Sequence, residues 1–151
     1  MTLFPDMTAA DAAASKLDTV TAAADIGTSW RYDHEAGRFR MVDGSPEACA
    51  GKEAVREWIA LMLRVWRGKN TVFDGIDAGV DVDSLLGTRQ LPEGFRRAEI
   101  IREVRETLAL CPAIADAWGF SVTREGRSMV IGFTCSLRSG ETMEVSADVG
   151  G

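Results

Sequence analysis

Residues 51–70 read GKEAVREWIALMLRVWRGKN, and this stretch decides the fold. Large apolar side chains recur in it at the spacing of one helix face. These residues are Val55, Trp58, Ile59, Met62, Leu63 and Trp66. Leu61 and Val65 lie off that face, so the apolar surface is wider than a single packing contact requires. We therefore predict a core helix buried on two sides, with a partner protein as one candidate for the second side, and a helix end at Gly68 and Asn70.

The composition bounds the rest of the chain. Its 151 residues are 46% hydrophobic, so the chain can form one hydrophobic core but is too short to form two. Its 17 Lys and Arg against 23 Asp and Glu give a formal charge of −6. This sign excludes a nucleic-acid partner, since phosphate binding needs a basic surface. Because no apolar run reaches the roughly 18 residues of a membrane span and no secretory signal is evident, we expect no membrane partner and synthesis in a cytoplasm.

The three cysteines, Cys49, Cys111 and Cys135, are odd in number and lack a Cys-x-x-Cys spacing. This pattern indicates neither a disulfide framework nor a zinc site. We expect each to behave as a small apolar residue.

The chain divides into an arm and a domain. Residues 1–27 are rich in Ala, Thr and Asp and have few bulky side chains to bury. They form either an arm that orders only in the assembly or a disordered leader. Residues 28–151 are predicted to form a single domain.

An early β-hairpin is predicted by two alternating runs. Trp30 and Tyr32 alternate with polar residues, a turn follows at 35–37, and residues 38–42 alternate again before a second turn. His34, the single histidine, sits beside the first turn. A general base needs an oriented partner, and none is evident, so we expect an exposed turn residue.

A second helix and a C-terminal meander complete the fold. Pro92 opens the helix and Pro112 stops it, with an apolar stripe that begins at Ile101. The residues that follow alternate as strands, with Met129, Ile131, Phe133, Cys135 and Leu137 on one face. We predict an α+β fold with two main helices packed on a small antiparallel sheet. Its last strand is short, which leaves an open sheet edge.

An acidic loop at residues 72–83 raises the question of calcium. No register supplies the oxygen ligands, Gly and Glu that a calcium loop requires. Turns at Asp74-Gly75 and Ala78-Gly79, with Asp81 or Asp83 as a helix cap, account for the same residues. We predict no metal and no cofactor, and a small cation-binding module stays an alternative.

Catalytic patterns are missing from the sequence. It contains neither a Gly-rich phosphate loop nor a Gly-x-Ser-x-Gly elbow. Carboxylates are plentiful, and a glycoside hydrolase needs two of them at a defined separation that a sequence does not give. We assign no catalytic residue, and a cell-wall glycan hydrolase stays an alternative.

The quoted helix also carries a family resemblance. Its start, GKEAVREWI, resembles that of the small baseplate wedge proteins of contractile phage tails, the XkdS-like group related to the sheath initiator of large myophages. Further marks follow in the family's order across residues 28–146: Arg67-Gly68, Gly79, Leu85-Leu86-Gly87, residues 108–114, Phe133-Thr134 and Gly140-Glu141. Ala78 and Cys111 depart from the family's usual aromatic residue and asparagine.

The resemblance implies a structural, non-enzymatic protein that joins the wedge to the first sheath ring and initiates sheath polymerisation. It implies a domain resembling the sheath strand-exchange domain, in a virion tail baseplate or phage-tail-like particle assembled in the host bacterial cytoplasm. The implied partners are larger baseplate wedge proteins and tail sheath subunits, with tube or hub proteins as further candidates. The hypothetical partner-binding residues are Arg67, Lys69, Asn70 and Phe73 after the helix, and Thr142, Glu144 and Val145 on the last strand.

Overall fold

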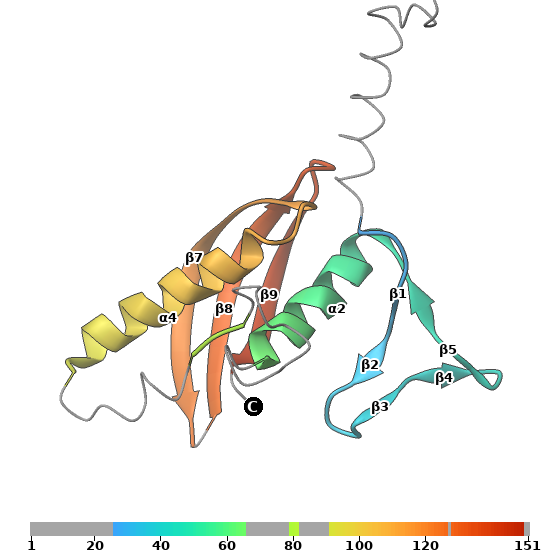
Figure 1. Ribbon diagram of the computed structural model, residues 1–151, viewed down its shortest axis with the longest axis horizontal. Coiled ribbons are helices and arrows are strands. Elements are labelled where there is room, and N and C mark those ends of the chain that lie inside the picture. The colour runs from blue at the N-terminus through green and yellow to red at the C-terminus, as the bar shows by residue number, and fades with distance from the viewer. Residues whose placement is uncertain (1–25, 66–78, 82–90, 127, 150–151) are drawn as a thin grey trace, which may run out of the picture.

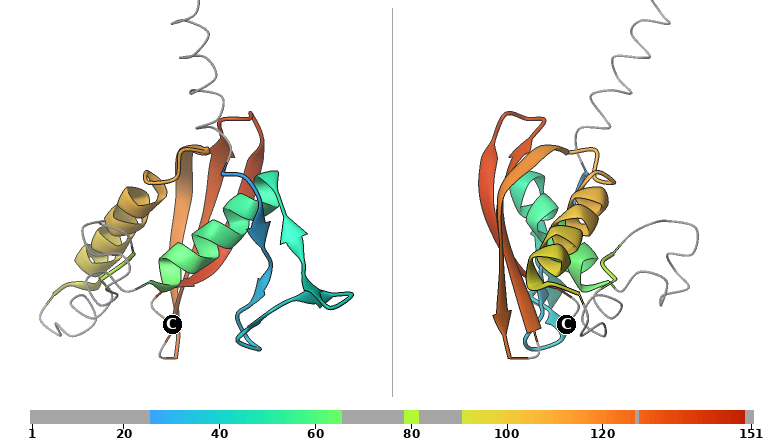
Figure 2. Two further views of the ribbon diagram at one scale, coloured as in Figure 1. Left: turned by 45° about the vertical axis from the view of Figure 1, so that its right-hand side comes forward. Right: turned by 90° about the vertical axis from the view of Figure 1, so that its left-hand side faces the viewer.

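The computed structural model describes residues 26–65, 79–81, 91–126 and 128–149. A three-stranded antiparallel sheet carries two helices on one face, and a small hairpin module lies beyond the first helix (Figures 1 and 2). The main elements are α2 (Gly51–Arg64), α4 (Glu93–Leu108), β7 (Ile114–Glu125), β8 (Ser128–Leu137) and β9 (Thr142–Val149). This confirms the predicted α+β class.

Helix α2 is shorter than its sequence predicts. Its apolar face is buried as expected, but the helix ends at Arg64, and Val65 already has an extended backbone (φ −74°, ψ 126°). The carbonyl of Val65 accepts the N–H of Val80 at 3.1 Å, so the chain pairs with a distant segment where the helix would otherwise continue. The predicted end at Gly68 and Asn70 is therefore wrong, and both residues lie outside the described part.

The predicted stripe of the second helix is confirmed at Val104, Leu108 and Cys111 and wrong at Ile101. Ile100 is 2% exposed, whereas Ile101 is only half-buried. The buried stripe continues through Val104 to Thr107 and Leu108. Thr107 is also fully buried, and a pattern of apolar residues alone misses it.

Residues 79–81 are held against α4 by two buried polar side chains. The Thr107 hydroxyl donates to the carbonyl of Gly79 at 3.0 Å, and the Glu103 carboxylate accepts the N–H of Asp81 at 2.6 Å. Val80 between them is fully buried. Buried main-chain groups need such partners, so Glu103 and Thr107 make the burial of this connecting segment possible.

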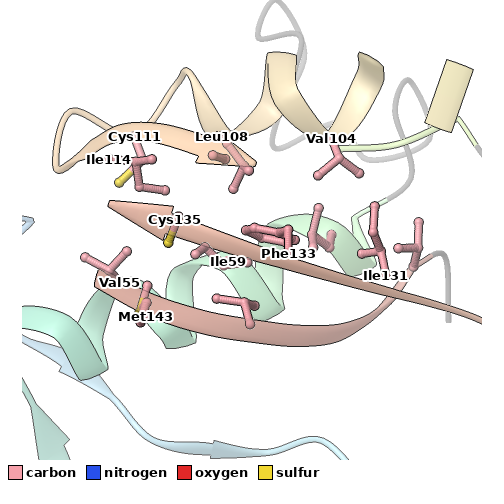
Figure 3. Packing of buried hydrophobic residues seen from close by; sticks show 14 of the residues in the cluster. Val55, Ile59, Val104, Leu108, Cys111, Ile114, Ile131, Phe133, Cys135 and Met143 are labelled. Carbon is pink, nitrogen blue, oxygen red and sulfur yellow. The ribbon is translucent and has the colours of Figure 1, made fainter. Parts of the chain in front are cut away.

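The core lies between the sheet and both helices. The predicted inward alternation from Met129 to Leu137 is confirmed, since all five residues are buried. Figure 3 shows Val55 and Ile59 of α2, and Val104 and Leu108 of α4, converging on β8 and on Met143 of β9. Phe120 stacks on Phe133 at a ring-centroid distance of 5.3 Å.

The hairpin module contains the predicted hairpin, as the ladder of β2 (Tyr32–Asp33) and β3 (Arg38–Phe39), and two further ladders. The further ladders pair β1 (Ser29–Trp30) with β6 (Ala48–Cys49), and β4 (Met41–Val42) with β5 (Ser45–Pro46). Both predicted turns are present. Asp43 and Gly44 form the second one with positive φ values of 50° and 80°, as the favoured two-residue hairpin turn requires.

The three ladders meet at a three-way junction formed by Arg31, Arg40 and Glu47. Arg31 N–H donates to the Glu47 carbonyl at 2.9 Å, Arg40 N–H to the Arg31 carbonyl at 3.0 Å, and Glu47 N–H to the Arg40 carbonyl at 2.8 Å. These hydrogen bonds close a ring. The ring links three very short ladders, none of which would be stable alone.

Candidate assembly surfaces

The edge of β9 is the first candidate surface. β9 pairs with β8 on one side, and among the described residues no strand pairs with its other side. Thr142 and Glu144 are exposed, while Val145 is 7% exposed and faces the core. The side chains of an added strand would therefore lie beside Thr142 and Glu144 on the outer face of the sheet and beside Val145 on the core face.

The remaining predicted contact residues are not placed. Arg67, Lys69, Asn70 and Phe73 lie outside the described residues. Of the predicted set, the structure thus brings together only the three residues of β9.

The far end of β9 contacts other elements. Arg64, the last residue of α2, forms an ion pair with Asp148 at 2.9 Å. A hollow of about 420 Å³ beside this pair is also lined by His34 of the hairpin module and Glu125 of β7. The predicted residues Thr142 to Val145 lie at the opposite end of the strand.

A second candidate surface is apolar and joins the hairpin module to α2. Trp30, Phe39 and Leu61 are each about half exposed. With Trp58 and other residues they line a hollow of about 420 Å³ that opens between the module and the helix. Exposed apolar patches of this kind often mark contacts with other proteins. In the sequence, the position of Leu61 off the helix face indicates this surface, whereas the alternation around Trp30 and Phe39 predicts strands but not which side chains stay exposed.

The described residues give little support to the two alternative functions, a cation-binding module and a glycan hydrolase. Among them no three His, Cys, Asp or Glu side chains are grouped to hold a metal ion. The hollow beside Arg64 contains two carboxylates, Glu125 and Asp148, as a glycoside hydrolase would require. Asp148, however, is ion-paired and Glu125 is exposed, so neither has the apolar surroundings that create a catalytic acid.

The cysteines are free and buried, in agreement with the sequence-based prediction. Burial raises the pKa of the Cys111 and Cys135 thiols above the ordinary value of 9.0, because it disfavours the thiolate. Since the thiolate is the nucleophile, neither side chain is activated for chemistry.

His34 is half-buried, so the prediction of an exposed turn residue is wrong. Its ring lies edge-on to Tyr32, with the centroids 5.1 Å apart. Its Nε2 atom is buried and has no hydrogen-bond partner in the described part of the chain. The turn folds back toward α2 and β9, which the local sequence does not indicate.

Comparison with known proteins gives a consistent result. The family model described as contractile injection system sheath initiator matches residues 28–141, from the hairpin module to the turn before β9. The chain is similar to the phage-like element PBSX protein XkdS of Bacillus subtilis (strain 168), with 21% identity over 122 residues. That alignment covers 81% of this chain and 82% of the relative. In the described residues, no helix is both long and apolar enough to cross a membrane.

Proposed function

This chain belongs to the contractile injection system sheath initiator family, and we propose that it joins the baseplate wedge to the first sheath ring and initiates sheath polymerisation. The observation that carries the proposal is the edge of β9, which has no partner strand among the described residues. The main-chain N–H and C=O groups of an edge strand form a template for another strand. Sheath subunits that supply such a strand would extend the sheet outward from the baseplate.

The wedge contact is assigned to the apolar surface of the hairpin module. The apolar surface formed by Trp30, Phe39 and Leu61 lies across α2 from the sheet and offers large side chains of the kind that dominate protein interfaces (Figure 1). Arg67, Lys69, Asn70 and Phe73 follow α2 in the chain and are proposed to extend this contact. Larger wedge proteins are the proposed partners here, with tube or hub proteins as further candidates.

The role proposed is structural. Sheath initiation requires binding surfaces and no bond-breaking chemistry, so we propose that the chain is not an enzyme. Residues 28–151 would act as one domain in the tail baseplate of a virion or phage-tail-like particle, after assembly in the host cytoplasm. Residues 1–27 would order on assembly.

A co-purification experiment tests the proposal. The tagged full chain is expressed with the other proteins of its own gene cluster, and the proteins that purify with it are quantified by mass spectrometry. The wild type should retain both sheath and larger wedge subunits. Glu144→Lys reverses a charge beside the open edge and should reduce sheath recovery by about tenfold, equivalent to about 1.4 kcal/mol, while wedge recovery is unchanged.

Glu35→Lys is the matched control. Glu35 is exposed in the first turn of the hairpin module, and its substitution makes the same charge change away from the sheet. Sheath recovery should match the wild type. Recovery of the wild-type chain without sheath or wedge subunits would refute the proposed function, and equal effects of both substitutions would refute the role of the β9 edge.

A further inference from the structure

A groove with a basic rim is lined by the first turns of α4, the end of β7 and the start of β8. Figure 1 shows these three segments at the same end of the fold. It has a volume of about 490 Å³, within the range of about 300–1,000 Å³ typical of ligand pockets. Apolar side chains and arginines line it together. The apolar residues are Ile100, Val122 and Met129, and the arginines are Arg96, Arg97 and Arg124.

The arginines of this basic groove are incompletely paired. Arg97 has a carboxylate partner in Glu93 at 3.7 Å, on the exposed side of the helix. Arg124 donates from Nε to the carbonyl of Gly126 at 3.2 Å and forms no ion pair within the described residues. The Nε of Arg96 is buried and has no hydrogen-bond partner in the described part of the chain. A buried N–H without an acceptor is costly. Because this Nε is not accessible to solvent, an incoming carboxylate would have to reach the terminal nitrogens of Arg96, which form no ion pair within the described residues.

The sign of the charge in the groove is opposite to that of the whole chain. Among the described residues, three arginines and one glutamate line it, whereas the chain carries a formal charge of −6. Helix α4 starts here without a side-chain cap, so its first turn adds a partial positive charge. The groove is therefore complementary to an anion.

We propose that the basic groove binds a carboxylate-rich peptide segment of a partner protein. A large apolar side chain of that segment packs against the partly exposed Val122, and flanking Asp or Glu carboxylates pair with Arg96 and Arg124. The apolar floor favours a peptide over a nucleic acid, whose phosphates gain nothing from it. This surface is separate from both the β9 edge and the apolar surface of the hairpin module, so the inference goes beyond the proposed function.

A peptide-binding experiment tests the inference. The purified full-length chain is labelled and applied to short overlapping peptides that cover the proteins of its own gene cluster. The peptides that bind should combine acidic residues with a large apolar residue, and binding should weaken as salt is raised. Charge reversal by Arg96→Glu or Arg124→Glu should weaken their binding by about tenfold or more.

Two controls separate binding from folding. Arg38→Glu makes the same charge change at an exposed site of the hairpin module and should leave binding within about twofold of the wild type. Arg124 is exposed, so its variant should keep the wild-type melting temperature even where Arg96→Glu does not. The inference is overturned if no peptide binds, if the bound peptides are not acidic, if the groove variants bind as the wild type does, or if the groove selects oligonucleotides instead. Sheath recruitment plays no part in this assay, so its failure would leave the proposed function standing.

Discussion

At the scale of single residues, His34 shows how a distant contact changes a local property. Its position beside a turn predicts a solvated ring, yet the fold places it next to Arg64 at the end of α2. Burial first, and the Arg64 guanidinium second, hold the pKa of His34 below its ordinary value of 6.5, because both disfavour the charged ring. The nearby carboxylates of Glu57, Asp33 and Asp148 oppose this shift without reversing it.

This lowered pKa predicts a loss of stability in weak acid. The unfolded chain binds a proton at His34 more readily than the folded chain, so the free energy of unfolding should fall as the pH decreases from 6.5 toward the lowered pKa. Above pH 6.5 the neutral His34 makes its full contribution to the free energy of unfolding. Urea unfolding of the wild type and of His34→Gln over this pH range measures it. The variant should lose this part of the pH dependence, and parallel curves for the two proteins would show that His34 does not contribute.

At the scale of elements, the three-way junction decides whether the short ladders of the hairpin module form. Glu47 contributes to the junction through its backbone hydrogen bonds and through its side chain. Its carboxylate lies 3.1 Å from Arg31 and 3.9 Å from Arg40. Arg31 also reaches Glu53 of α2 at 3.3 Å, which ties the junction to the helix. These ion pairs thus hold the module in place, because its ladders of two residues each contribute little stability.

Glu47→Gln should loosen the junction without changing its shape. Partly exposed ion pairs contribute about 0.2–1 kcal/mol, so the amide protons of Arg31, Arg40 and Glu47 should exchange about two- to fivefold faster in the variant. Hydrogen exchange followed by NMR measures these rates. Glu35→Gln, at an exposed turn of the same module, should leave them unchanged. Similar rates in both variants would mean that the backbone ring alone holds the junction.

At the scale of the whole molecule, α2 faces two environments. One side packs into the core between helix and sheet, where Ile59 is fully buried, and the other side leaves Leu61 51% exposed beside the hairpin module. The sequence predicted burial on two sides, and within this chain one of them is only partly covered. This is the surface that we assign to the wedge contact.

Substitution of these two neighbours should separate stability from assembly. Ile59→Ala should lower the free energy of unfolding by about 2–5 kcal/mol, since it leaves a cavity in the core. Leu61→Ala should cost less than about 1 kcal/mol, because half of the side chain is already solvated. Denaturant unfolding of the full chain measures both values. Equal losses would show that Leu61 is part of the core and does not belong to a binding surface.

Sequence alone determined the two helices, the inward alternation from Met129 to Leu137, the buried cysteines and both hairpin turns. Each of these follows from local periodicity or from the backbone preference of a few neighbouring residues, so a short window of sequence contains the information. The family resemblance likewise depends on the order of local marks along the chain, and the family match over residues 28–141 confirms it.

Only the tertiary structure decided the end of α2 at Arg64, the burial of Glu103 and Thr107, the three-way junction and the basic groove. In each case the controlling contact joins segments far apart in the chain: Val65 with Val80, Glu103 with Asp81, and the start of α4 with the end of the sheet. A polar side chain becomes a core residue only when a distant main-chain group needs its hydrogen bond. Arginines separated in sequence become one anion-binding surface only when the fold brings them together.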